Sequence, residues 1–542
     1  MSAARLRWLR GVLRLLALVA VAACADGGLL AGVSGGDGDD PLAVARAHAG
    51  EAGNVDAAIP PACYARTDGV RNRCWTCHTD GRGRTRFDDA ARQAAYAFAD
   101  SARVNHWRNL FADRRAAIAA VDDDAMLAWV RADNYRALRA AMARVPVGYP
   151  GFRPDLDLAR GFDDHGFARD GSGWRAVRYQ PFPGVGWPSG GSIGDLFVRL
   201  PPAFRADAAG RGDPAIYRLN LALVEAAVTA ADPTGPVDRE VEPIDERLLG
   251  EDLDGDGAVT AAVTRIRRLP ARYAGGAAGE PVVAQLCPLG TELLHSVRYL
   301  DPDAPTLAST RMKELRYARK TERLDDWGIA RAYDEVADEA SEGHAPRYQG
   351  SAEGGFASGF GWQYQGFIED AAGRLRLQTD EEHRACLGCH GALGVTVDHG
   401  FALARKVPGA DGWRLQDLRG LRDRPQLGHP RPEVWTVATR AGASDAELPA
   451  WWFRDGRPAD DVLARAAVGG DRDLAWLLAP ARAEALALDK AYLAVVREQS
   501  FARGRDAVAR PATGYHAQIA DEDTGLAAAG RVYHDARLLL AW

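Results

Sequence analysis

Two short segments of the chain each combine two cysteines and one histidine in the pattern Cys-x-x-Cys-His, written CxxCH below. Thiols with this spacing can add to the two vinyl groups of a haem, while the adjacent imidazole reaches the iron from the same side. The residue counts predict about 0.002 such matches by chance, so two accidental matches are implausible. The residues that would attach haem are Cys74, Cys77 and His78 in the first motif and Cys386, Cys389 and His390 in the second.

Other chemistries use the same residue types. Four thiolates from the two Cys-x-x-Cys pairs would suit a tetrahedral zinc ion, and a single pair would suit a thiol redox centre. The two pairs, however, lie more than 300 residues apart, and each is followed by a histidine that a four-cysteine site does not need. Haem is therefore the favoured interpretation of both motifs.

The N-terminus has the layout of a secretory signal. Four arginines between Arg5 and Arg14 precede an apolar stretch at 15–23, which is shorter than the roughly 20 residues that span a bilayer. The stretch ends in Val-Ala-Ala-Cys, which resembles a bacterial lipobox, where the cysteine is acylated and becomes the mature N-terminus. We expect a lipid anchor at Cys24, with plain signal cleavage elsewhere as the alternative. Ala25 follows in place of an aspartate, which by the same resemblance indicates the outer membrane.

An export signal also fits a family resemblance of the two motifs. Both match the haem-attachment sequence of the cytochrome c superfamily, whose members receive their haem outside the cytoplasm. The chain is similar to that superfamily only in the motifs and their immediate flanks. The resemblance implies that the cysteines of each motif form thioether bonds to one haem c, and that His78 and His390 are the proximal iron ligands.

The sixth iron ligand distinguishes an electron carrier from an enzyme, because an open iron position can bind small oxidants. In single-haem relatives the distal Met follows the motif by several tens of residues, yet no Met follows His390. The candidates are His106, with Met126 and Met142 behind it, for the first haem, and His295, Met312 or no protein ligand for the second. Each candidate also has a plain structural interpretation, as a hydrogen-bonded histidine or a core methionine.

A second metal pattern lies in the middle of the chain. Asp252, Asp254 and Asp256 stand at positions 1, 3 and 5 of an EF-hand-type loop, with Gly257 at position 6, as calcium binding requires. Position 12 is Val263, so the bidentate glutamate is missing. We expect calcium held with help from another segment, a weak site, or a solvated turn.

Two cysteines remain once the lipid site and the motifs are assigned. An oxidising compartment would permit a disulfide between Cys63 and Cys287, which would tie the segment before the first motif to the middle of the chain. Two separate buried thiols are the alternative, because sequence does not show whether the two residues approach each other.

The elements that must position these residues change character along the chain. Ala-rich helical patterns follow the first motif, Gly, Pro and aromatic residues crowd the middle, and a β-hairpin at 367–377 precedes the second motif. The predicted parts are a lipoprotein-type signal peptide at 1–24, a flexible tether at 25–58, a first haem region at 59–147, a middle region at 148–379 and a second haem region with C-terminal helices at 380–542. The predicted fold class is α+β, with helical haem-binding regions at the N- and C-terminal parts around a loop- and strand-rich middle region.

These observations predict an exported dihaem c-type cytochrome that transfers electrons between redox proteins of the bacterial cell envelope, facing the periplasm or the cell surface. A net charge of -7 and a pI near 6.0 leave no global basic field, so nucleic acid is not an expected partner. The alternative is a dihaem peroxidase-like enzyme that reduces a small oxidant at a five-coordinate haem. The 312 residues between His78 and His390 are many more than such enzymes have. A lipid-anchored scaffold in an electron conduit is a third interpretation.

Overall fold

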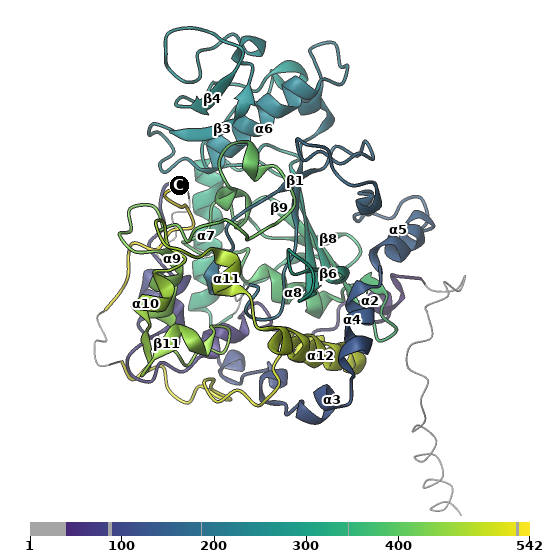
Figure 1. Ribbon diagram of the computed structural model, residues 1–542, viewed down its shortest axis with the longest axis vertical. Helices are drawn as coiled ribbons and strands as arrows, with labels where there is room; N and C mark the ends of the chain where they lie inside the picture. The colour runs from purple at the N-terminus through teal and green to yellow at the C-terminus, as the bar shows by residue number, and fades with distance from the viewer. Residues whose placement is uncertain (1–39, 85–88, 186, 345, 527–530) are drawn as a thin grey trace, which may run out of the picture. The chain divides into compact units, whose positions relative to one another are not determined.

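The fold is described from a computed structural model, which describes residues 40–84, 89–185, 187–344, 346–526 and 531–542 (Figure 1). These residues belong to one compact unit that begins at Asp39. The predicted signal peptide and its lipid site at Cys24 lie outside the described residues. The segment predicted to be a tether is folded from residue 40 onward: helix α2 spans Ala43–Ala47, and the side chain of Leu42 is fully buried.

An antiparallel sheet of eight strands organises the described part of the chain, in the order β1-β2-β5-β6-β9-β8-β7 with β10 paired to β9. The strands are β1 (Arg175–Val177), β2 (Leu196–Arg199), β5 (Glu292–Leu300), β6 (Ala308–Lys320), β7 (Gln349–Ser351), β8 (Gly355–Ala357), β9 (Trp362–Glu369) and β10 (Leu375–Leu377). Leu294 and Leu315 are buried on one face and Glu314 on the other, because protein covers both faces of the sheet. Two small ribbons pair β3 (Arg239–Ile244) with β4 (Val263–Ile266), and β11 (Phe453–Arg454) with β12 (Arg457–Pro458).

Helices pack against this sheet and against one another. Besides α2 they are α3 (Arg115–Ala119), α4 (Asp123–Arg131), α5 (Tyr135–Ala143), α6 (Pro214–Val228), α7 (Asp326–Ser341), α8 (Asp380–Leu387), α9 (Glu433–Ala441), α10 (Asp460–Leu463), α11 (Leu474–Leu478) and α12 (Arg482–Glu498). Helix α12 contacts α3, α4 and β5, and α6 packs on β3 (Figure 1). None of the described helices is long and apolar enough to cross a membrane.

The predicted arrangement, with helical haem-binding regions at the two ends of the chain, is wrong. Residues 90–114 form only short 3-10 turns and irregular backbone, and their amides bond to the C-terminal segment: Tyr96 N donates to Glu522 O at 3.0 Å, and Asn105 N to Ala517 O at 3.1 Å. Amides used in this way cannot make the i to i−4 bonds of a helix. A large antiparallel sheet takes the place of the predicted arrangement.

Elements that depend on local sequence lie where they were predicted. The hairpin is confirmed: β9 and β10 pair antiparallel, with Leu375 opposite Glu369 and Leu377 opposite Phe367. Helices α10 and α12 lie within 380–542, where C-terminal helices were predicted. Helix α4 begins at Asp122, whose side chain accepts from the amides of Asp124 and Ala125 as an N-cap.

One fully buried arginine joins three distant parts of the chain. Arg405 binds both carboxylate oxygens of Glu433 on α9, and it donates to Gln180 O at 2.9 Å and to Leu538 O at 2.8 Å. We predict that Arg405→Met lowers the free energy of unfolding by about 3–5 kcal/mol, because Glu433 would keep a buried charge without its partner. The exposed Arg419, which pairs with Asp417, gives the control Arg419→Met, expected to change stability by no more than about 0.5 kcal/mol. Equal urea midpoints for the two variants would contradict this account.

Candidate functional site

The first motif is held in a 3-10 turn, Arg73–Thr76, that begins at Asn72. Asn72 Oδ1 accepts from Cys74 N at 3.0 Å, and Asn72 N donates to Arg440 O at the end of α9 at 3.1 Å. His78 N donates to Cys74 O at 2.9 Å. Because the turn is closed by these bonds, Cys74, Cys77 and His78 keep a fixed relation to one another.

The His78 ring is oriented by a carboxylate. Its Nδ1 lies 2.7 Å from Asp89 Oδ2, and the other oxygen of Asp89 accepts from Thr79 N at 2.9 Å. A carboxylate at Nδ1 favours the tautomer with the proton on that nitrogen, and this leaves Nε2 with the lone pair that a metal needs. Among the described residues no hydrogen bond reaches His78 Nε2.

The second motif begins in the last turn of α8. This helix opens with a capping box, in which Thr379 accepts from Glu382 N and Glu382 accepts from Thr379 N. His390 Nδ1 lies 2.9 Å from the carbonyl oxygen of His399, so Nε2 is again the nitrogen without a proton. Desolvation by the surrounding protein lowers the pKa of His390 to about 4. The imidazole is therefore neutral at pH 7, as an iron ligand must be.

The two motifs meet in space, although 312 residues separate their histidines. Desolvation and then the charge of Cys77 raise the pKa of the Cys389 thiol to about 12, so the two thiols interact electrostatically. The loop after the second motif packs on the first: a Cβ added to Gly394 would lie 2.3 Å from Thr79 O, closer than real contacts allow. Only glycine fits at this contact.

The two remaining cysteines do not pair. Cys63 and Cys287 are both free, so the alternative of two separate thiols is confirmed and the disulfide is not formed. Desolvation, followed by the charges of Cys74 and Cys77, raises the pKa of Cys63, which places this thiol beside the first motif. Cys287 lies elsewhere, with its backbone N bound to Asp398 Oδ2 at 2.9 Å.

The four motif thiols do not form a zinc site. Among the described residues, one group of three or more metal-ligating side chains has its ligand atoms within 4.8 Å of one another, and it contains no cysteine. In a tetrahedral zinc site each thiolate sulfur lies about 2.3 Å from the metal, so no two of the sulfur atoms are more than about 4.6 Å apart. The geometry therefore favours separate use of each CxxCH motif.

A cavity of about 460 Å³ is lined by residues that contact the motifs, although no motif residue lines it. This volume falls in the range of about 300–1,000 Å³ that is usual for cofactor and small-molecule sites. One wall is the face of β6 that carries Glu314 and Arg316. Another contains Arg505, whose Nη1 lies 3.6 Å from Cys386 Sγ, and a third contains Glu447. Arg505 thus connects the cavity wall to the thiol of Cys386 in the second motif.

A family model described as "-like lipoprotein" matches residues 47–431, which is more than half of the chain and includes both motifs. The chain belongs to this lipoprotein family. An uncharacterized lipoprotein of Aquifex aeolicus (strain VF5) is 28% identical to it over 519 residues, covering 84% of this chain and 86% of the relative. No solved structure matches the chain. Membership agrees with a lipid anchor in the cell envelope.

The assignment of this lipoprotein to the cytochrome c superfamily is therefore wrong. The family that matches is a lipoprotein family, and the matched region folds around an antiparallel sheet. The resemblance rested on ten residues in two motifs, and a motif of five residues describes a local chemistry that unrelated folds can carry.

The distal candidates of the lipoprotein fall into two groups. His295 lies opposite Arg316 on the sheet, its Nε2 is 3.3 Å from Tyr179 Oη, and its ring centroid is 5.1 Å from that of Trp187. Desolvation, Arg316 and then His390 lower the pKa of His295 to about 3, so His295 interacts electrostatically with His390. The three internal methionines are at most 1% exposed and belong to apolar clusters that contain no motif residue: Met126, Met142 and Met312.

His106 lies in irregular backbone between two 3-10 turns, and its role as a distal ligand stays a prediction. It is half-buried, and its Nε2 is 3.3 Å from Ser101 O. Its neighbour Asn105 is tied to the C-terminal segment by bonds to Ala517 O and His516 O. The helix that would have carried His106 toward the motif does not form. Among the described residues no hydrogen bond joins His106 to either motif.

The predicted calcium loop gains a carboxylate from outside it. Oxygens of Glu246, Asp252 and Asp254 lie within 4.8 Å of one another, and Asp256 is not in the group. Glu246, which lies outside the loop, thus supplies the carboxylate that is missing at position 12. Its two oxygens already accept from Leu253 N at 2.7 Å and Thr260 N at 2.8 Å. Calcium binding stays a prediction.

Acidic groups in the cavity differ in their proton affinity. Desolvation alone would raise the pKa of Glu314, but Arg316 and Arg505 lower it to about 2. Desolvation raises the pKa of Glu447 to about 8, although Glu447 pairs with Arg73 at 2.8 Å, because Asp445 binds the same guanidinium. One arginine thus serves two carboxylates, and Glu447 retains its proton near neutral pH.

We predict that the free energy of unfolding falls as the pH rises from about 4.5 to about 8. The pKa of Glu447 in the folded chain lies above its ordinary value of 4.5, so its stabilising contribution is complete below about pH 4.5 and is lost as the pH rises through about 8. Glu447→Gln should remove this slope in urea unfolding measured between pH 5 and 8.5. The matched control is Glu484→Gln, because Glu484 is an exposed glutamate on the wall of the same cavity. An unchanged slope in Glu447→Gln would contradict the assignment.

Proposed function

We propose that the chain is a lipid-anchored protein that binds two haem c groups through its CxxCH motifs and transfers electrons between redox proteins of the cell envelope. One observation carries the proposal. In both motifs Nδ1 of the histidine is held by a fixed acceptor, Asp89 for His78 and the His399 carbonyl for His390, so Nε2 is free to bind iron beside two free thiols.

The prosthetic group would supply one-electron redox chemistry at its iron. The residues of the chain would hold it and tune it. Asp89 makes His78 the stronger electron donor, because a carboxylate acceptor raises the basicity of an imidazole more than a carbonyl does. We therefore expect the site at His78 to have the lower reduction potential and the site at His390 the higher one.

The contact between the motifs supports electron transfer within the chain. Gly394, in the loop after the second motif, packs directly on Thr79 beside the first, and the thiols of Cys77 and Cys389 interact electrostatically. Groups attached at these points would share one region of the protein. Arg316 and Arg505 on the cavity wall would stabilise negatively charged propionate groups at its edge.

The neighbourhood of His295 and His390 favours a carrier over an enzyme. The imidazole of His295 on β5 would fill the sixth position at that iron and exclude small oxidants. A peroxidase-like enzyme is the second candidate, and the observation in its favour is the cavity. Glu447, which retains its proton near pH 7, would serve there as a proton donor to a bound oxidant.

Location follows from the anchor. A lipid on Cys24 would tether the protein to the envelope, and Ala25 after it favours the outer membrane, with the folded unit facing the periplasm or the cell surface. Partners there would be redox proteins of the envelope.

Covalent haem can be counted directly. We predict that the full chain, expressed with an intact export signal in cells that mature haem c, carries two haems by intact mass and by haem staining on a denaturing gel. Cys74→Ser with Cys77→Ser should leave one, and Cys386→Ser with Cys389→Ser should leave the other. The matched controls are Cys63→Ser and Cys287→Ser, which should keep two. Protein that is exported and lipidated yet carries no covalent haem would contradict the proposal.

A further inference from the structure

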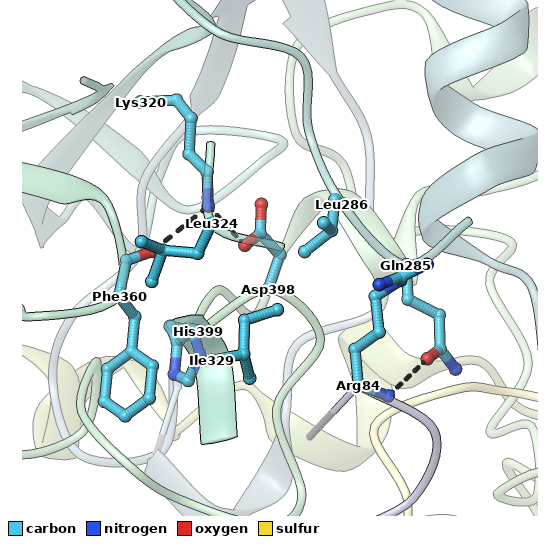
Figure 2. A pocket seen from close by; sticks show the side chains of 9 residues that line it. All are labelled: Arg84, Gln285, Leu286, Lys320, Leu324, Ile329, Phe360, Asp398 and His399. Carbon is cyan, nitrogen blue, oxygen red and sulfur yellow. Dashed lines mark hydrogen bonds and ion pairs between the residues drawn. The ribbon is translucent and has the colours of Figure 1, made fainter. Parts of the chain in front are cut away.

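A buried polar cluster contains His399, whose carbonyl oxygen lies 2.9 Å from His390 Nδ1, and Figure 2 shows its side chains. It consists of Lys320 at the end of β6 and of Asp398 and His399 in the loop after the second motif. The space between these side chains is about 10 Å³, which holds at most one water molecule. The cluster therefore has no room for a ligand. Any influence that it has on the second motif must be transmitted by contacts within the protein.

Asp398 and His399 both adopt a backbone conformation that residues other than glycine rarely use. Their φ angles are 45° and 56°. Consecutive residues in this left-handed region persist only when their surroundings impose it, and such positions gather at functional sites.

Asp398 is held by its carboxylate. Its Oδ1 accepts from Lys320 Nζ at 2.6 Å and its Oδ2 from Cys287 N at 2.9 Å, while the lysine also donates to Phe360 O at 3.2 Å (Figure 2). The side chains of Lys320 and Asp398 are no more than 3% exposed. A buried ion pair with all of these partners fixes the loop to the sheet.

His399 links that fixed point to the second motif. Its ring stacks on Phe360 with centroids 3.8 Å apart, and its Nδ1 lies 2.8 Å from Gly391 O, in the residue that follows His390. Its own carbonyl oxygen is the acceptor for His390 Nδ1. The left-handed turn thus aims this carbonyl at the motif histidine.

We propose that Lys320, Asp398 and His399 are positioning residues that fix the ring orientation of His390 and thereby set the reduction potential of the second haem. The inference rests on the proposed function. The ion pair holds the turn, the turn aims the carbonyl, and the carbonyl holds Nδ1, so that the direction of Nε2 is fixed as well. None of the three residues needs to touch a prosthetic group.

Two variants of the full-length protein test this. Lys320→Met removes the charge that holds Asp398. Asp398→Asn breaks the ion pair more gently, because asparagine still accepts from Cys287 N and tolerates the left-handed conformation. We expect both to shift the midpoint potential of the second haem by at least about 59 mV, a tenfold change in its ratio of oxidised to reduced forms. We also expect both to broaden its low-spin electron paramagnetic resonance signal, since that signal reports ring orientation.

The matched control is Lys406→Met. Lys406 pairs with Glu225 at 3.0 Å, and both side chains are fully buried, but no hydrogen bond or ion pair among the described residues connects Lys406 to either motif. This variant should lose stability like Lys320→Met while both midpoint potentials and both resonance signals stay as in the unchanged protein. A role of Lys320 in stability alone would make the two lysine variants behave alike.

Haem stoichiometry, measured first by intact mass, separates the two levels of the proposal. Absence of covalent haem in the unchanged protein would overturn the proposed function and this inference with it. Two haems together with an unshifted second potential and an unchanged signal in Asp398→Asn would overturn the positioning role alone. If Lys320→Met does not fold, the Asp398→Asn result decides.

Discussion

The hydrogen bond at Nδ1 of each motif histidine is the interaction on which the rest of the site depends. An imidazole can present Nε2 to a metal only if its other nitrogen holds the proton, and a fixed acceptor at Nδ1 settles that choice. Asp89 serves His78, and the carbonyl of His399 serves His390. Much of the surrounding structure holds these acceptors in place: Thr79 N binds Asp89, and the turn at Asp398 and His399 is tied to the sheet.

The sheet brings the second motif, the cavity and His295 together. His295 on β5 pairs with Arg316 on β6, which pairs with Gly366 on β9, so the three residues form one row across neighbouring strands. Gly366 N donates to the Nε2 of His383 on α8 at 2.9 Å, which docks the helix that ends in the second motif. A rigid row of this kind holds functional groups more accurately than loops do.

The predictions from sequence that are correct concern features that depend only on residues close together in the chain. The thiols and histidine of a CxxCH motif carry their chemistry within five residues, and the hairpin before the second motif follows from its own alternation and turn. The first of the helical patterns predicted after the first motif is mostly irregular because the amides of Tyr96 and Asn105 bond to residues more than 400 positions away, whereas α4 and α5 form in the pattern that follows it. Lys320 and Arg505 could not be found in advance, since their partners near the second motif are set by long-range packing.

Two covalently held haems, with the second closed on its distal side, are the central claim of this account. The most direct test is the visible absorption spectrum of the purified full-length protein, ferric and ferrous, with and without carbon monoxide. The account predicts haem c bands and, in the variant Cys74→Ser with Cys77→Ser that keeps only the second haem, a low-spin iron whose ferrous spectrum carbon monoxide leaves unchanged. A high-spin haem that binds carbon monoxide in that variant would contradict the closed second site and favour the enzyme, and a spectrum of the unchanged protein without haem bands would contradict the account as a whole.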